Sequence, residues 1–106
     1  MPETRAHKEA KQRAAGNSGR TEVPLQGGQR LDARTPKTAT EIERSGNLAQ
    51  LKAAAGRLDA SHAPRKVLQV PEKDMAKARE AMRSVGTGGT VRNFGGTKKS
   101  SVRRSR

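Results

Sequence analysis

The chain contains no cysteine, no tryptophan and no tyrosine, and Phe94 is its single aromatic residue. Without cysteine there can be no disulfide, no thiolate zinc site and no cysteine nucleophile. The two histidines, His7 and His62, lie far apart and lack metal-ligand spacing, so we expect any metal site to use oxygen ligands. The near absence of aromatic rings leaves almost nothing for stacking on single-stranded bases.

Long hydrophobic runs are also missing. No segment approaches the roughly 20 apolar residues that a membrane-spanning helix requires, and no apolar stretch follows residues 1–5. We therefore expect a cytoplasmic protein without a membrane partner. Its 106 residues allow one domain at most, and the 30% of apolar residues predicts a small core of aliphatic side chains, methionine and alanine.

Positive charge dominates the composition. Lysine and arginine number 23 against 10 aspartate and glutamate residues, which gives a formal charge of +13 and favours a polyanionic partner. Contacts with phosphates give affinity without sequence preference. We expect nucleic acid as the partner, duplex or structured, with DNA favoured over RNA. The residues expected to contact it are Arg30, Arg34, Lys98, Lys99, Arg103 and Arg104.

Apolar spacing predicts an α/β chain. Residues 3–15 are good helix formers, and alternating patterns over 21–26, 29–34 and 39–44 predict a three-stranded meander. A helix from residue 48, a strand over 66–70, a helix over 71–85 and a strand over 90–94 follow. The expected fold is an αβββαβαβ sandwich, divided into a basic N-terminal helix or arm (1–19), an α/β core (20–95) and a disordered basic tail (96–106).

Three carboxylates fall on the predicted meander. With the turn centred between Pro36 and Lys37, Asp32 on one strand lies directly across from Glu41 on the next. Side chains alternate along a strand, so Glu43 points to the same face as Glu41. The sequence therefore predicts an acidic cluster on one face of a β-hairpin.

The opposite face of the same hairpin is expected to be apolar, with Leu31 and Ile42 both pointing toward the helices. Like charges directly opposite each other are unfavourable by a few tenths to about 1 kcal/mol, so a bound cation would explain the acidic face better. A hard-oxygen site suits Mg²⁺ or Mn²⁺, and Asp32 and Glu41 are the expected ligands. Such an ion would assist the attack of water on a phosphodiester.

The small size, the element order and Asp32 followed by Glu41-Ile42-Glu43 resemble the PD-(D/E)xK nuclease superfamily over residues 3–94. Its smallest members include resolvase-like and toxin nuclease domains. The resemblance implies a restriction-endonuclease-like fold and a metal-dependent nuclease, with Asp32, Glu41 and Glu43 as catalytic residues. Glu43 stands where the family has lysine, and Gln50 and Lys52 on the following helix are expected to supply a surrogate near the site.

Other interpretations stay open. The three carboxylates are equally consistent with the solvated face of an amphipathic sheet. The composition also suits a non-catalytic basic nucleic-acid-binding protein of ribosomal or nucleoid type. A third alternative is the toxin domain of a secreted bacterial effector, with an immunity protein as its partner. An edge strand and an apolar helix face leave room for a homodimer.

Overall fold

The computed structural model describes residues 4–16, 19–25 and 28–104. It confirms the predicted α/β class, with three α-helices and one six-stranded mixed sheet. In chain order the elements are α1 (Arg5–Ala15), β1 (Arg20–Pro24), β2 (Arg30–Arg34), β3 (Thr38–Ile42), α2 (Leu48–Ala60), β4 (Arg65–Gln69), the short 3₁₀ helix η2 (Glu72–Asp74), α3 (Met75–Val85), β5 (Gly89–Arg92) and β6 (Lys99–Val102).

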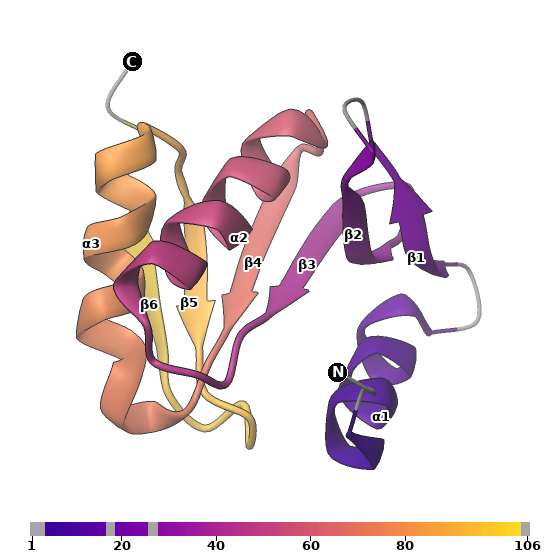
Figure 1. Cartoon of the computed structure of the whole chain (residues 1–106), viewed down its shortest axis with the longest axis horizontal. Coiled ribbons are helices and arrows are strands. Elements are labelled where there is room, and N and C mark those ends of the chain that lie inside the picture. Colours follow the sequence, from indigo (N-terminus) through magenta and orange to yellow (C-terminus); the bar gives the residue numbers. More distant parts are fainter. Residues whose placement is uncertain (1–3, 17–18, 26–27, 105–106) are drawn as a thin grey trace.

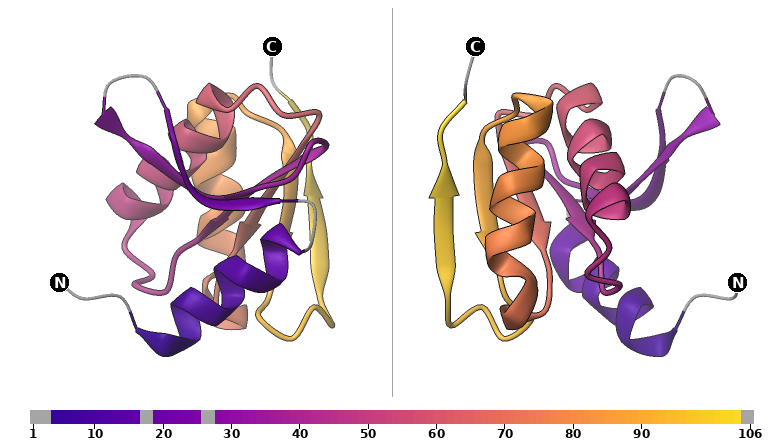
Figure 2. Two further views of the ribbon diagram at one scale, coloured as in Figure 1. Left: turned by 90° about the vertical axis from the view of Figure 1, so that its right-hand side faces the viewer. Right: turned by 60° about the vertical axis from the view of Figure 1, so that its left-hand side comes forward.

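The strands lie in the sheet in chain order, from β1 at one edge to β6 at the other. β1, β2 and β3 form the predicted antiparallel meander, β3, β4 and β5 are parallel, and β6 returns antiparallel to β5. Figures 1 and 2 show α2 and α3 side by side on one face of the sheet, while α1 packs on the other face against β1–β3. The sheet is thus covered by helices from both sides.

The main core lies between the sheet and the α2–α3 pair. Its residues are aliphatic side chains, methionines and many alanines, and the small alanine side chains let the helices approach the sheet closely. The largest fully buried apolar side chains are Leu31, Leu51, Leu58, Leu68, Val70, Met82 and Val91.

The C-terminal segment corrects one prediction. Residues 96–106 were expected to be disordered, yet Lys99–Val102 form the edge strand β6, paired along its length with β5. Gly96 lies in the connecting turn with φ of 70°, and Val102 is buried in the core. A single apolar residue among serines and basic residues is too weak a pattern to predict a strand, whereas pairing with β5 satisfies the backbone.

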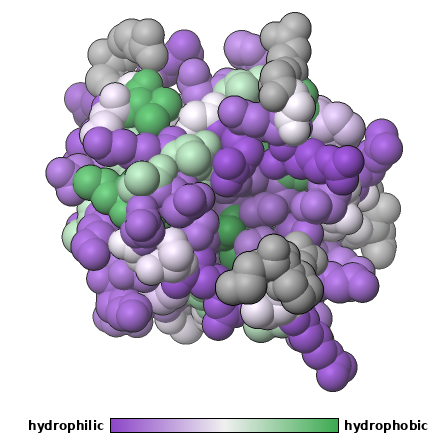
Figure 3. All heavy atoms as spheres, in the orientation of Figure 1, coloured by the Kyte–Doolittle hydropathy of each residue, from purple (hydrophilic) through white to green (hydrophobic). Residues whose placement is uncertain are grey.

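The surface is largely polar. Figure 3 shows hydrophilic residues over most of one face of the molecule, with hydrophobic residues in small patches between them. Within the part of the chain that the structure describes, no helix combines the length and the apolar character needed to span a membrane.

Gly89, at the start of β5, allows β5 to approach β4 closely. Its φ is 156°, and a Cβ atom there would lie 2.3 Å from the carbonyl oxygen of Lys66. We expect Gly89→Ala to lower the free energy of unfolding by about 1–3 kcal/mol, because the backbones must move apart. Gly56 in α2 has open space around its Cα, so Gly56→Ala should instead stabilise by roughly 0.5–1 kcal/mol. Urea titration of both variants measures these changes in the free energy of unfolding. Equal changes in the two variants would contradict the prediction.

Candidate functional site

The register of the meander places two predicted site residues opposite each other. Ala33 on β2 pairs with Thr40 on β3, as expected for a turn centred between Pro36 and Lys37. One step further along the strands, this register sets Asp32 across from Glu41. The register therefore agrees with the predicted opposition of Asp32 and Glu41.

The third carboxylate beside this pair is Glu22 and not Glu43. On the other side of β2, Thr21 pairs with Ala33 and Val23 pairs with Leu31, so Glu22 of β1 faces Asp32. Glu22 has a φ of 52°, which is unusual for a residue other than glycine. Glu22, Asp32 and Glu41 thus occupy laterally adjacent positions on three neighbouring strands, and we call them the carboxylate row.

Side chains replace the main-chain ladder between Asp32 and Glu41. The Asp32 N–H donates to Glu41 Oε2 at 2.7 Å, and the Ile42 N–H donates to Asp32 Oδ2 at 2.8 Å. The paired positions of the β2–β3 ladder end at Ala33 and Thr40, and the two strands diverge beyond them (Figure 1). The two carboxylates are therefore held in the space between the strands by reciprocal hydrogen bonds.

Asp32 faces basic residues of α1. Its Oδ1 lies 3.6 Å from His7 Nε2, and its side chain is 16% exposed. The Lys11 side chain is 4% exposed and its Nζ donates to Glu22 Oε2 at 2.8 Å. Burial raises the pKa of Asp32, while the hydrogen bond from Ile42 and the charges of His7 and Lys11 act to lower it.

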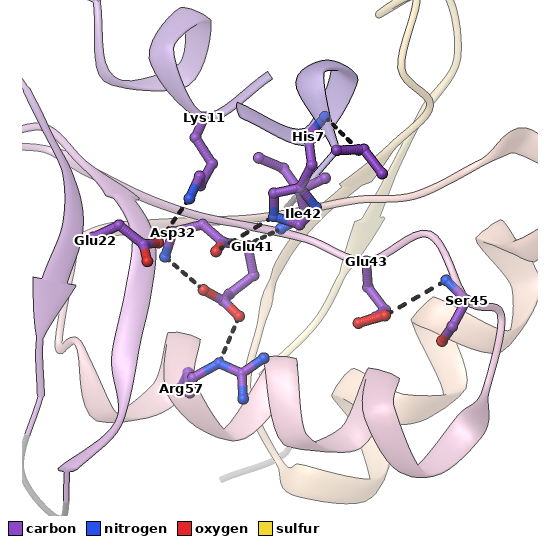
Figure 4. Close-up of polar contacts among 10 residues, drawn as sticks. His7, Lys11, Glu22, Asp32, Glu41, Ile42, Glu43, Ser45 and Arg57 are labelled. Carbon is purple, nitrogen blue, oxygen red and sulfur yellow. Dashed lines mark hydrogen bonds and ion pairs between the residues drawn. The ribbon is translucent and has the colours of Figure 1, made fainter. Parts of the chain in front are cut away.

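Glu41 faces α2. Its side chain is 1% exposed, and its Oε1 accepts from Arg57 Nε at 2.6 Å. Burial, followed by repulsion from Asp32, raises the pKa of Glu41 to about 7, although the Arg57 guanidinium favours the charged form. Figure 4 shows this arrangement, with His7 and Lys11 on one side of the two carboxylates and Arg57 on the other.

The predicted division into an acidic and an apolar face is wrong. Leu31 joins the main core, but Ile42, although buried, does not belong to that core. Asp32 and Glu41 likewise extend toward opposite sides, one to α1 and the other to α2. Two strands share one pattern of faces only while their ladder is continuous, and here it stops before Asp32.

The other predicted catalytic residues lie apart from the carboxylate row. β3 ends at Ile42, and Glu43 in the following loop accepts a hydrogen bond of 3.5 Å from the Ser45 N–H. Gln50 and Lys52 are exposed on α2. No hydrogen bond or ion pair between described residues joins either side chain to the carboxylate row, so the expected grouping of Glu43, Gln50 and Lys52 around Asp32 and Glu41 is not found.

His7, Lys11 and Arg57 are the residues that sequence analysis missed. His7 and Lys11 are four residues apart and therefore share one face of α1, which is a pattern that could have singled them out. Arg57 follows Gln50 by seven residues, two helical turns further along α2, and stands between buried alanine and leucine positions. The spacing of residues along each helix does not predict which strand that helix packs against.

The six basic residues expected to contact nucleic acid do not form one surface. Arg30 and Arg34 belong to β2, whereas Lys98, Lys99, Arg103 and Arg104 lie in or beside β6, with three strands between the two groups. Lys98 pairs with Glu72 at 2.7 Å, and Arg34 donates to the Thr35 carbonyl at 2.8 Å. The two groups can therefore act only as separate contacts.

Within the described ranges, no group of three or more His, Asp or Glu side chains is arranged to hold a metal ion. Asp32 and Glu41 remain as a pair of hard-oxygen donors on adjacent strands. Mg²⁺ commonly binds through one or two carboxylates and completes its shell with water and substrate phosphates. The described residues therefore offer a metal ion at most these two carboxylates at this place, and not a closed, all-protein cage.

Comparison of the chain with family models, with curated proteins and with solved structures finds no significant match.

Proposed function

We propose that this chain is a metal-dependent nuclease that hydrolyses phosphodiester bonds in duplex or structured nucleic acid. The observation that carries the proposal is the reciprocal pair of hydrogen bonds that holds Asp32 and Glu41 between β2 and β3. The main-chain ladder between the two strands ends beside this pair, at Ala33 and Thr40. Beyond it, the half-buried carboxylate of Asp32 and the buried one of Glu41 take the place of that ladder, in a molecule whose net charge of +13 suits a polyanionic substrate.

Asp32 and Glu41 would hold Mg²⁺ or Mn²⁺. Both are carboxylates, and burial together with the repulsion that Asp32 exerts on Glu41 disfavours the doubly charged pair, so a bound cation would stabilise it further. When bound, the ion would lower the pKa of the attacking water and neutralise charge on the scissile phosphate.

The chain's own residues orient this pair. Arg57 holds Glu41 through Oε1, and the main-chain N–H of Asp32 holds Oε2, so the carboxylate of Glu41 has a fixed position. Lys11 offers the role that the family resemblance assigns to position 43, where this chain has Glu. Its ammonium group is buried beside the carboxylate row, anchored by Glu22, and its charge acts on Asp32. We therefore assign to Lys11, in place of the predicted Lys52, the role of stabilising negative charge at the site.

The order of elements supports the restriction-endonuclease-like topology. The chain begins with a helix, continues with an antiparallel meander and a helix, and returns with a strand parallel to β3. Asp32 and Glu41 lie on the second and third strands of this unit. This order of elements, with the carboxylates on neighbouring strands of the meander, supports the proposed topology.

Cleavage assays with matched variants test the proposal. Asp32→Asn and Glu41→Gln should each lower metal-dependent cleavage by more than about 100-fold, because each removes a ligand charge. Asp59→Asn and Glu80→Gln make the same chemical changes away from the row and should retain activity. Substrates are supercoiled plasmid, branched DNA and structured RNA with Mg²⁺, Mn²⁺ or EDTA. Cleavage that survives in Asp32→Asn would refute the proposed site.

One observation favours a second candidate, a non-catalytic nucleic-acid-binding protein. Arg57 lies 2.6 Å from Glu41 and Lys11 lies 2.8 Å from Glu22, so the chain's own cations already neutralise much of the row. In that case the ion pairs only join α1 and α2 to the sheet. Salt-dependent binding of all three substrates, without cleavage and without any effect of Mg²⁺ or Mn²⁺, would favour this candidate.

A further inference from the structure

A second set of polar residues continues across the sheet beside the carboxylate row. Ile42 of β3 pairs with Gln69 of β4, and Gln69 pairs with Arg92 of β5. Asp32 is connected to this set through a hydrogen bond, because its Oδ2 accepts from the Ile42 N–H. Gln69 and Arg92 are the last residues of parallel strands, and ligands of open α/β sheets bind outside such carboxyl ends.

A cavity of about 270 Å³ opens at this place, between α1 and the carboxyl ends of β4 and β5. It is polar and basic, and none of its lining residues is acidic. These residues are Ala10, Arg13, Gln69, Arg92, Phe94, Gly95 and Gly96. We call this cavity the arginine pocket.

Its two guanidinium groups have no acidic partner among the described residues. Arg92 Nε donates to Gln69 Oε1 at 2.9 Å, and Gln69 is itself 5% exposed, which fixes the guanidinium in the pocket. Arg92 is half-buried, and this burial lowers the pKa of its guanidinium. Arg13 takes part in no ion pair with a described residue. A half-buried guanidinium that lacks a carboxylate, together with a second, exposed arginine at the same cavity, is suited to bind a phosphate group.

Phe94 adds an apolar surface to the same pocket. It is the only aromatic residue of the chain, it is half-buried in the β5–β6 loop, and it borders the cavity next to Gly95 and Gly96. The guanidinium of Arg44 lies 4.8 Å from the centre of its ring, which holds the ring in place by a cation–π contact. A single ring beside two arginines offers contacts to one base and one phosphate.

We propose that the arginine pocket binds one unpaired nucleotide of the substrate strand, with its phosphate on Arg13 and Arg92 and its base against Phe94. The inference rests on the proposed nuclease function and names how its substrate is held. Neighbouring strands lie about 4.8 Å apart, so the pocket on β5 is about 14 Å across the sheet from Asp32 on β2. The pocket therefore anchors the strand near the carboxylate row without contacting the scissile phosphate.

The absence of tryptophan and tyrosine gives a direct test. Phe94→Trp introduces a single fluorophore into the pocket, and this protein is titrated with a 5′-phosphorylated single-stranded oligonucleotide in EDTA. We expect a saturable change of the tryptophan emission. Adding Arg92→Gln should weaken binding by about tenfold or more, because a charge-assisted phosphate contact is lost. Arg13→Gln should also weaken binding of the oligonucleotide. Because Arg13 lies on the surface of α1, this change leaves the hydrogen bond between Arg92 and Gln69 in place.

Arg65→Gln in the same background is the matched control. It removes the same charge from an exposed position that lines a different basic cavity, beside Pro64, Gly88 and Arg104. This variant should bind the oligonucleotide nearly as tightly as the Phe94→Trp protein. Equal weakening by Arg65→Gln and Arg92→Gln, or an emission that does not respond to the oligonucleotide, would overturn the pocket, because binding would then depend on net charge alone.

The pocket and the nuclease can fail separately. Binding is measured in EDTA, where metal-dependent cleavage does not occur, and is repeated in Asp32→Asn. A fluorescence response that depends on Arg92, in a protein that never cleaves, supports the pocket and refutes the nuclease. Cleavage that depends on Asp32 but is unchanged in Arg92→Gln and Arg13→Gln, with no fluorescence response, supports the nuclease and refutes the pocket.

Discussion

Glu41→Gln is expected to remove most of the pH dependence of stability between about pH 5 and about pH 8 in the metal-free protein. Glu41 has a pKa of about 7 in the folded chain against an ordinary value of 4.5. A carboxyl with a raised pKa holds its proton more tightly when folded, so its stabilising effect is complete below pH 4.5 and lost as pH rises through 7. The free energy of unfolding of the unmodified chain should therefore fall by up to about 3 kcal/mol across this range.

Urea titrations at the two pH values, with EDTA present, measure this difference. Glutamine keeps the shape of Glu41 and carries no proton to lose, so the variant should show a much smaller decrease. Asp32 has a pKa raised in the same direction and leaves a residual slope. Glu80→Gln, on the exposed side of α3, is the control and should retain the full pH dependence. An identical slope in Glu41→Gln and Glu80→Gln would show that Glu41 ionises as an ordinary surface carboxyl.

Arg57→Met should destabilise the protein strongly at about pH 8 and only weakly at about pH 5. The guanidinium bonds directly to Glu41 at 2.6 Å, and its charge favours the ionised carboxylate. Its removal leaves a buried carboxylate without its partner, which costs roughly 2–4 kcal/mol. At the lower pH Glu41 is protonated, so only the hydrogen bond is lost. Thermal and urea unfolding at both pH values provide the measurement.

The double variant Glu41→Gln/Arg57→Met separates the ion pair from packing. If the cost of Arg57→Met comes from an unpaired charge on Glu41, the double variant should recover most of the lost stability at the higher pH. Lys52→Met removes a basic residue from an exposed position of the same helix and should change stability by less than about 0.5 kcal/mol. If the two single effects simply add, Arg57 stabilises the fold through its packing and not through Glu41.

The local patterns of this sequence are strong enough to predict most of the fold. Leu48, Leu51 and Leu58 have helical spacing and lie on α2, and the same holds for Met75 and Met82 on α3. These residues point to one side because the helix repeat is about 3.6 residues, which is a property of the chain alone. Segments without a regular pattern of apolar and polar residues were predicted less well. The clearest case is β6, which has one buried valine.

The site was predicted in part for the same reason. A hairpin turn of known centre fixes which residues are opposite each other, so Asp32 and Glu41 could be paired from the sequence. Glu43 was included because the alternation was extended past the point where β3 ends. Glu22 was not included because the sequence analysis did not predict the register of its strand with β2, in which Thr21 pairs with Ala33 and Val23 pairs with Leu31.

The sequence by itself therefore determined the α/β class, the basic character of the chain and the opposition of Asp32 and Glu41, because helix period, strand alternation and charge are local properties. Only the tertiary structure decided which side chains surround those carboxylates. His7, Lys11 and Arg57 reach them because α1 and α2 pack on opposite faces of the sheet. The gathering of Arg13, Arg92 and Phe94 around one cavity has the same origin, since contacts between residues distant in the chain depend on how the elements pack.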